Sequence, residues 1–337
     1  MANLESSYMG IQTKSPLVVG ACSLTSNMKA IKKIEEAGAG ALVIKSLFEE
    51  EIQLEKYKME EDIEMYDDWH AEMTDIFPDM EHAGPEEHLM WVKKTKQEVN
   101  IPVIASLNAV SHDTWVEWAK RLEETGVDGL ELNFFSTPTS FDDNAKKIED
   151  DQVESLRDVK KAVKIPVSVK LSHFYTNPLE LVKRMADTGV DGFVLFNRMF
   201  HPSFDIEKES LSFPFNLSQP NDHRLPMRFV GMLYGNTKGS LCASNGVHRA
   251  QDAVEVLLAG ADVFQVVSTL YQNSIGVVEE INKGISEWMD RKGYRSIDDF
   301  RGKLSAQKTG DKSAYRRAQY VKMLLHADEY VKRPKLI

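Results

Sequence analysis

The chain has 337 residues, 42% hydrophobic, 28% charged and 9% aromatic, a composition that excludes collagen, coiled-coil rods and wholly disordered chains. Its 41 Lys and Arg against 52 Asp and Glu give a formal net charge of −11, which argues against a nucleic-acid partner. Two cysteines, the lack of a signal-peptide pattern and the lack of a long apolar stretch indicate a cytoplasmic protein without a membrane anchor.

A recurring phrase organises the chain: an amphipathic helix, a glycine that ends it, and a short apolar strand. It occurs at 35–45, 124–133, 187–197 and 258–267, and glycine just past a helix end tolerates the left-handed backbone of a C-cap. The phrase Ile-Pro-Val, at 101–103 and 165–167, opens two strands, where proline costs no ladder hydrogen bond. In all, the sequence predicts eight strands, near 16–21, 41–45, 102–106, 128–133, 166–171, 191–196, 240–245 and 262–267.

Eight strand–helix units predict an α/β fold, a single (β/α)₈ TIM barrel. An open, doubly wound sheet is the alternative, although no Gly-x-Gly-x-x-Gly turn follows the first strand. The connections 46–101 and 197–239 are too long for one helix each. Both follow the carboxyl end of a strand, so they are predicted to be long insertions on the active-site face of the barrel.

The two insertions differ in composition. Residues 48–90 contain 16 acidic residues and two lysines, a net charge of −14, which is typical of a solvated face and leaves open a lid, a partner surface or disorder. The second insertion is rich in Phe, Pro, Ser and Asn and indicates a hairpin or lid. We expect the barrel to occupy residues 1–305. Residues 306–337 form a basic tail whose helix, around Tyr315 to Tyr330, would pack on the barrel or on a partner subunit.

Two lysines end apolar strands, Lys45 after Leu42–Ile44 and Lys170 after Pro166–Val169. A lysine at that position faces the mouth of a barrel, where a partly desolvated ammonium needs an anionic or carbonyl partner. Snorkelling to solvent is the alternative for each. The equivalent positions of the two favour a functional role.

The loops after the last two predicted strands are short and polar. Ser244-Asn245-Gly246 and Ser268-Thr269 each precede a predicted helix, where free backbone N–H groups bind anions, and these loops form the usual phosphate site of such barrels. Ordinary helix capping is the alternative. The histidines of the acidic segment, His70, His82 and His88, repeat no known ligand spacing, so no metal site is expected.

Seven motifs, taken in chain order, point to one family. They are Gly20-Ala21-Cys22, Ile44-Lys45-Ser46, Glu131-Leu132-Asn133, Val169-Lys170-Leu171, Leu217-Ser218, Ser244-Asn245-Gly246-Val247 and the stretch from Lys292 to Leu304. In these motifs the sequence resembles the dihydroorotate dehydrogenases, FMN-dependent barrel enzymes of pyrimidine synthesis, and especially their soluble class. The similarity runs from about Pro16 to Ser305.

The resemblance implies FMN as cofactor, with its phosphate on 244–246 and 268–269. It implies that Lys170 lies near the N1–O2 edge of the flavin, that Lys45 lies between flavin and substrate, and that Asn133 and Asn197 contact the substrate. The cofactor-binding residues it implies are Ala21, Cys22, Lys45, Ser46, Asn108, Asn133, Lys170, Ser218, Ser244, Asn245, Gly246, Ser268 and Thr269.

In the family, a base removes a proton from carbon 5 of dihydroorotate while hydride leaves carbon 6 for the flavin. Ser136 stands at the position of that base, so the implied catalytic residues are Ser136, Lys45 and Lys170. Its neighbours Phe135 and Thr137 include no proton acceptor. The family's Asn-x-x-Gly-x-x-Asn loop, which binds the pyrimidine, has no counterpart in 46–101.

Three hypotheses remain. The first is an FMN-dependent oxidoreductase that takes hydride from dihydroorotate or a related reduced ring with a CH–CH bond. The second is an FMN-binding scaffold or regulator without dehydrogenase activity. The third is a barrel that binds a phosphate ester and no flavin. The family implies a homodimer. No cysteine-rich cluster motif is present, so no iron–sulfur centre is expected in this chain, and an electron-transfer partner would have to carry one.

Overall fold

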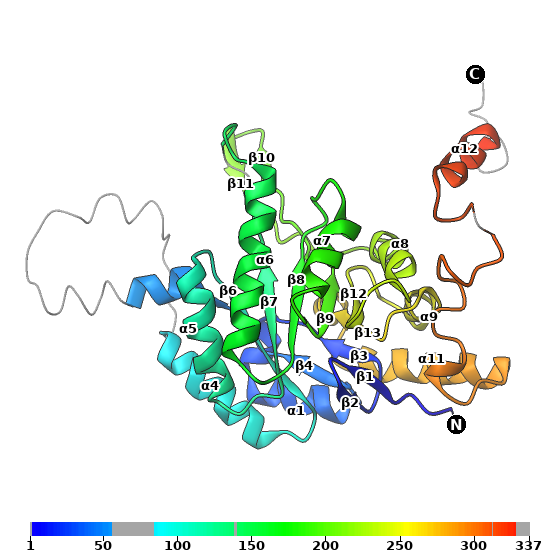
Figure 1. Cartoon of the computed structure of the whole chain (residues 1–337). Coiled ribbons are helices and arrows are strands. Elements are labelled where there is room, and N and C mark those ends of the chain that lie inside the picture. Colours follow the sequence, from blue (N-terminus) through cyan, green and yellow to red (C-terminus); the bar gives the residue numbers. More distant parts are fainter. Residues whose placement is uncertain (1, 56–83, 138–139, 312, 328–337) are drawn as a thin grey trace, which may run out of the picture.

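The computed structural model describes residues 2–55, 84–137, 140–311 and 313–327 (Figure 1). Eight parallel strands form one closed barrel. β4 pairs with β3 on one side and with β6 on the other, which joins the two ends of the sheet. The predicted TIM barrel is therefore confirmed, and the open sheet is excluded. The barrel strands are β3 (Leu17–Val19), β4 (Ala41–Val43), β6 (Val103–Asn108), β7 (Gly129–Phe134), β8 (Val167–Leu171), β9 (Gly192–Leu195), β12 (Ser240–Ser244) and β13 (Val263–Val266).

Helices surround the barrel because each presents one apolar face to the strands. α5, for example, buries Trp115, Trp118, Ala119 and Leu122 and exposes its charged residues. The predicted glycine ends are real, since Gly126 and Gly189 both have φ of +85°. The helices are α1 (Met28–Glu36), α4 (Pro85–Glu98), α5 (His112–Glu123), α6 (Ala145–Ala162), α7 (Pro178–Ala186), α8 (Arg224–Leu233), α9 (Ala250–Ala259), α10 (Ser268–Gln272) and α11 (Val277–Lys292), with 3₁₀ turns at Ser23–Ser26 and Ile297–Asp299.

A hairpin of β1 (Ser6–Tyr8) and β2 (Ile11–Thr13) closes the amino end of the barrel. Tyr8 and Met9 are buried in the interior core with Val18, Val43 and other strand residues. The hairpin is fixed to the first residues of the strands, because the backbone N–H of Met9 donates to Oγ of Ser240 at 2.9 Å. Because the hairpin covers the amino end, a ligand-binding site is expected at the opposite, carboxyl end of the barrel.

Both insertions leave from that carboxyl end. The first contains β5 (Leu47–Phe48), which pairs with the end of β6, and residues 49–55, which are helical. Most of the acidic segment, with His70 and His82, lies outside the described residues. The second insertion contains the expected hairpin, β10 (Ser203–Asp205) paired with β11 (Ser210–Ser212), and then α8. Figure 1 shows the hairpin projecting from the barrel near one end of α6.

The tail after the barrel runs along α8 and then turns away from it. Arg228 of α8 donates to the carbonyl of Tyr315, and the Tyr315 hydroxyl donates to the carbonyl of Leu304. α12 (Arg317–Leu325) follows and buries no residue. The expected helix is therefore present, but it does not pack on the outside of this barrel (Figure 1). Among the described helices, none is long and apolar enough to cross a membrane.

Candidate active site at the carboxyl ends of the strands

A cavity of about 370 Å³ opens at the carboxyl ends of the strands. This volume lies within the usual range for a small-molecule site. We call it the strand-end cavity. Residues at or shortly after the ends of β3, β4, β8, β9, β12 and β13 surround it, and nine of the predicted site residues line it: Ala21, Cys22, Lys45, Ser46, Lys170, Asn197, Ser244, Asn245 and Ser268.

Lys170 is the cation at the buried side of this cavity. Only 11% of its side chain is exposed, and its ammonium lies 3.8 Å from a carboxylate oxygen of Glu131. It also donates to the side-chain carbonyl of Gln265 at 3.1 Å, and the amide nitrogen of Gln265 donates to Glu131. These contacts hold a charged lysine in a nearly dry position, where its field acts strongly on any bound group.

Lys45 is the second cation of the cavity and is more exposed. Its backbone N–H donates to Oγ1 of Thr25 at 2.8 Å, and its ammonium lies 3.5 Å from Glu51. Glu51 belongs to the start of the acidic segment and also accepts from the backbone of Phe48. The first insertion therefore places a carboxylate beside Lys45, which partly balances its charge. Next to it, Ser46 shares a hydrogen bond with Ser106 at 2.7 Å between hydroxyl oxygens.

Asn133 and Asn197, the two predicted substrate contacts, are hydrogen-bonded to each other. Nδ2 of Asn197 donates to Oδ1 of Asn133 at 2.6 Å. Asn197 lines the strand-end cavity, whereas Asn133 does not and contacts the Asn197 amide. Asn133 is therefore placed to position the Asn197 side chain.

The two predicted phosphate loops lie side by side. Asn245 and Gly246 have φ of +88° and +70°, and a Cβ on Gly246 would meet the backbone nitrogen of His223 at 2.2 Å. Thr269 is buried and donates to the carbonyl of Val247. Asp252 accepts from the backbone N–H groups of His248 and Arg249. Because the N–H groups of His248 and Arg249 are already used, the backbone N–H groups that could bind an anion in this loop are those of the turn at 245–247.

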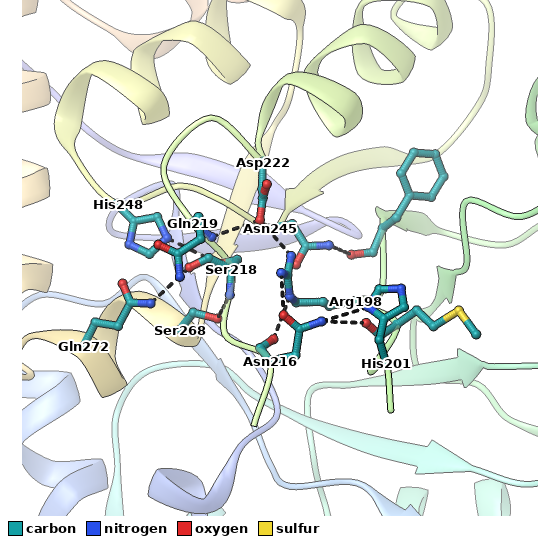
Figure 2. A network of polar contacts seen from close by, with 12 residues as sticks. Arg198, His201, Asn216, Ser218, Gln219, Asp222, Asn245, His248, Ser268 and Gln272 are labelled. Atoms are coloured by element: carbon teal, nitrogen blue, oxygen red, sulfur yellow. Dashed lines mark hydrogen bonds and ion pairs between the residues drawn. The ribbon is translucent and has the colours of Figure 1, made fainter. Parts of the chain in front are cut away.

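The second insertion is tied to these loops by a polar network (Figure 2). The backbone N–H of Ser218 donates to Oγ of Ser268 at 2.9 Å, and the Ser218 hydroxyl lies 3.3 Å from Nε2 of His248. Gln272 donates to the carbonyl of Ser218 at 3.1 Å. Burial lowers the pKa of His248, so its ring is neutral near pH 7. The predicted residue Ser218 thus stands beside the phosphate loops.

Arg198 is the residue that the sequence analysis missed. Its Nε donates to the carbonyl of Asn216 at 2.7 Å, one terminal nitrogen donates to Oδ1 of Asn216 at 3.0 Å, and the other pairs with Asp222 at 2.7 Å. Three of the five guanidinium N–H groups are used, so each terminal nitrogen keeps one. Arg198 lines the strand-end cavity and a neighbouring cavity of about 390 Å³ that contains His173 and His201. The sequence did contain one indication of this role, because Arg198 directly follows the predicted site residue Asn197.

Three aromatic side chains and a thiol also line the strand-end cavity. Phe200 and Phe215 come from the second insertion, and the hydroxyl of Tyr271 lies 2.6 Å from Oγ of Ser23. Burial raises the pKa of the Cys22 thiol and of the Tyr271 hydroxyl, so both are protonated near pH 7. Neither is an anion that would oppose an anionic ligand.

Six predicted residues do not line this cavity: Asn108, Asn133, Ser136, Ser218, Gly246 and Thr269. Ser136 lines two other cavities, one with Glu149 and Tyr175 and one with Phe134 and Gln152. Asn108 ends β6 opposite Phe48 of β5. Within the described part of the chain, no group of three or more His, Cys, Asp or Glu is placed to hold a metal ion.

The residues of the strand-end cavity fit an FMN molecule. The cavity is large enough for a flat ring system, its apolar walls include Val267 and Phe215, and a nearly dry cation stands on one side of it. Left-handed backbone at Asn245 and Gly246 forms a tight turn, and Asn245 is part of the cavity lining. A planar, anionic, phosphate-bearing group matches this set of donors.

Residues 79–289, more than half of the chain, match the family model described as dihydroorotate dehydrogenase. A "Dihydroorotate dehydrogenase B (NAD(+)), catalytic subunit" of Thermoplasma volcanium is 27% identical over 306 residues, which cover 90% of this chain and 98% of the relative. A "Putative dihydroorotate dehydrogenase A (fumarate)" of Aeropyrum pernix is 31% identical over 227 residues, 66% of this chain and 73% of the relative. A "Dihydroorotate dehydrogenase A (fumarate)" of Lactobacillus delbrueckii subsp. bulgaricus is 27% identical over 222 residues, 63% and 70% of the two chains. The chain therefore belongs to the dihydroorotate dehydrogenase family of oxidoreductases.

Proposed function

We propose that the protein binds FMN in the strand-end cavity and oxidises dihydroorotate, or a closely related carboxylate with a CH–CH bond, in the space beside it. The observation that carries the proposal is the convergence of Lys45, Lys170 and Asn197 on one cavity next to the turn at 245–247. FMN, when bound, supplies an acceptor for the hydride that leaves the substrate.

Each residue of the cavity has a separate task in this proposal. Lys170 stabilises negative charge at the buried edge of the cofactor, since its own charge is held by Glu131 and Gln265. Asn197, oriented by Asn133, hydrogen-bonds a polar group of the substrate. Ser136, which lines two other cavities and not this one, is proposed to take the proton.

Arg198 extends the proposal to the recognition of a carboxylate. The acidic segment has no copy of the family's pyrimidine-binding loop, so the substrate must be held by other groups. Arg198 keeps one N–H on each terminal nitrogen and lies next to Asn197 on the cavity wall. Hydrogen bonds from a guanidinium to a carboxylate are among the stronger ones in proteins. We therefore assign Arg198 to the carboxylate of the substrate.

The electron acceptor is proposed by analogy with the relatives. Two of their names specify NAD⁺ or fumarate, and the name "catalytic subunit" indicates that a further subunit works with the NAD⁺-linked relative. An electron-transfer partner is therefore part of the proposal, together with the homodimer that the family resemblance implies. Cys22 and Cys242 are both unpaired, which supports a cytoplasmic location.

The visible spectrum tests the proposal. Purified protein is saturated with FMN, freed of excess cofactor, and placed under anaerobic conditions before dihydroorotate is added. We expect retained FMN and rapid loss of the absorption band near the flavin maximum. Dihydrouracil, which has the same ring without the carboxylate, is the matched control and should act far more slowly.

The other outcomes identify the alternatives. Retained FMN with an unchanged band after addition of dihydroorotate would contradict dihydroorotate oxidation and favour the scaffold or another substrate. Protein that retains no FMN would contradict the cofactor assignment and favour the phosphate-ester hypothesis.

A further inference from the structure

α12 is a helix without a packing partner in its own chain. It has nine residues, none of them buried. An isolated helix shorter than about 12 residues is marginal in water, and most helices in proteins owe their stability to packing of an apolar face. Five of the nine side chains are large, apolar and exposed: Tyr320, Val321, Met323, Leu324 and Leu325. The helix therefore needs a surface to cover it.

The sequence of α12 defines the kind of surface that it needs. Tyr320 and Leu324, and likewise Val321 and Leu325, are four residues apart, so these four lie on one face of the helix. Arg316 and Lys322 flank that face, Arg317 lies on it at its start, and no acidic residue occurs between 313 and 327. A matching surface is apolar at its centre and acidic at its edge.

The β10–β11 hairpin has that character. Its turn contains Glu207 and Glu209 against one cation, Lys208, which pairs with Asp205. Large apolar side chains along the hairpin and its flanks are exposed by 51–80%: Phe200, Phe204, Ile206, Leu211, Phe213 and Phe215. Apolar patches of this size on a soluble protein mark interaction sites.

The helix and the hairpin of one chain do not lie together. The Tyr315 hydroxyl donates to Leu304 and its carbonyl accepts from Arg228 of α8, two residues before α12 begins. Two residues span at most about 7 Å, so this anchor keeps the start of α12 near α8. Figure 1 shows α12 on the far side of α8 and the hairpin near the end of α6.

We propose that α12 of one copy packs on the β10–β11 hairpin of a second copy, and that the second copy returns the same contact. A two-fold axis makes such an exchange reciprocal and closed. The apolar face of α12 covers the phenylalanines, and Arg316 and Arg317 lie opposite Glu207 and Glu209. Because Phe200 and Phe215 also line the strand-end cavity, each copy would support the cavity wall of the other.

Charge reversal tests the contact. Arg316→Glu with Arg317→Glu defines a tail variant, and Glu207→Lys with Glu209→Lys defines a hairpin variant; Asp205 is left intact because it accepts from the backbone N–H groups of the turn. In sedimentation velocity we expect a dimer for the full chain, mostly monomer for each variant, and a dimer again when both changes are in one chain. Lys146→Glu with Lys147→Glu, on the exposed face of α6, is the matched control and should stay dimeric.

Mixing the two variants separates exchange from folding within one chain. A mixed dimer keeps one contact with both original surfaces, so the mixture should recover dimer that neither variant forms alone. A monomeric full chain, or dimers that persist in both variants, would overturn the proposal. A hairpin variant that stays dimeric beside a monomeric tail variant would also overturn it, because α12 would then dock elsewhere.

Cross-linking identifies the chain to which α12 binds. Leu324→Cys and Phe213→Cys are combined, while the native Cys22 and Cys242 are buried. Oxidation should give a covalent dimer on a non-reducing gel. A disulfide within one chain would overturn the exchange. Neither experiment depends on FMN or on turnover, so failure of the proposed enzymatic function leaves the result interpretable.

Discussion

The Lys170 ammonium lies 3.1 Å from the side-chain carbonyl oxygen of Gln265, and the amide nitrogen of the same Gln265 donates to Glu131. The three residues belong to β8, β13 and β7, which are not all neighbours in the barrel. All three are buried. One network of charge and hydrogen bonds therefore crosses the barrel interior beside the strand-end cavity.

Replacing Lys170 by Met should destabilise the protein as well as weaken FMN binding. Glu131 would remain buried without its cation, and breaking a buried ion pair in this way costs about 3–5 kcal/mol. Urea unfolding of the variant should show that loss. The double variant K170M/E131Q removes the orphaned charge and should recover much of the stability but not the FMN affinity. Equal instability of the single and double variants would contradict this account.

Ser136→Ala tests the base. The variant should retain FMN, because Ser136 does not line the strand-end cavity, and should lose substrate-driven bleaching. Anaerobic stopped-flow absorbance measures the bleaching rate. Thr137→Ala, one residue further along, is the matched control and should bleach normally. An unchanged rate in Ser136→Ala would remove Ser136 from the mechanism.

Arg198→Gln tests recognition of the carboxylate. Hydrogen bonds to charged groups contribute about 1.5–3 kcal/mol, so orotate should bind the FMN-loaded variant about tenfold to hundredfold more weakly. Uracil lacks the carboxylate and should bind both proteins equally. Perturbation of the flavin spectrum gives both affinities. Equal weakening for orotate and uracil would show instead that Arg198 only holds Asn216 and Asp222 in place.

Gly246→Ala should abolish FMN binding, with little bound cofactor after gel filtration. An added Cβ would meet the backbone nitrogen of His223 at 2.2 Å, and φ is +70°. Gly126 separates the two effects, since it has φ of +85° and nothing within 4 Å of an added Cβ. Gly126→Ala should lose only stability, by about 1 kcal/mol. Normal FMN retention in Gly246→Ala would place the phosphate elsewhere.

His88 should make stability depend on pH. Burial, helped by the nearby Lys45 charge, lowers its pKa to about 4, and its Nε2 atom has no hydrogen-bond partner among the described residues. The unfolded chain, with a pKa near 6.5, takes up the proton first as pH falls. Stability should therefore decline between pH 6.5 and 4, by about 3 kcal/mol for this group, and its contribution should level off below pH 4.

Urea unfolding across that pH range measures the decline. His88→Gln should flatten the slope, whereas His326→Gln, in the exposed tail, should leave it unchanged. A slope identical in all three proteins would contradict the role of His88.

The barrel could be predicted from the sequence because each strand–helix unit carries its own local signal. Gly126 and Gly189 show this, since each ends a helix with the left-handed backbone that its position predicted. Lys45 and Lys170 could be predicted for the same reason: the end of an apolar strand is a position on the active-site face. Asn197 and Ser244 followed from strand ends or from the family resemblance.

The parts that depend on long-range contacts could not be predicted. Arg198 acts with Asn216 and Asp222, which are 18 and 24 positions away in an irregular insertion. The contact between Glu51 and Lys45 could not be predicted, because Glu51 is one of many acidic residues in the segment 48–90 and nothing in the sequence distinguishes it from the others. The periodicity of the tail predicted a helix near α12 but could not distinguish a barrel surface from a partner subunit.

The closure of the amino end by the β1–β2 hairpin has an evolutionary consequence. Tyr8 and Met9 fill the barrel interior at its amino end. The packing there does not depend on which loops are attached at the carboxyl end. Segments such as 197–223 can then be lengthened, shortened or exchanged between lineages without loss of folding. Changes in the loops at the carboxyl end can therefore alter the cavity without disturbing the packing of the barrel interior.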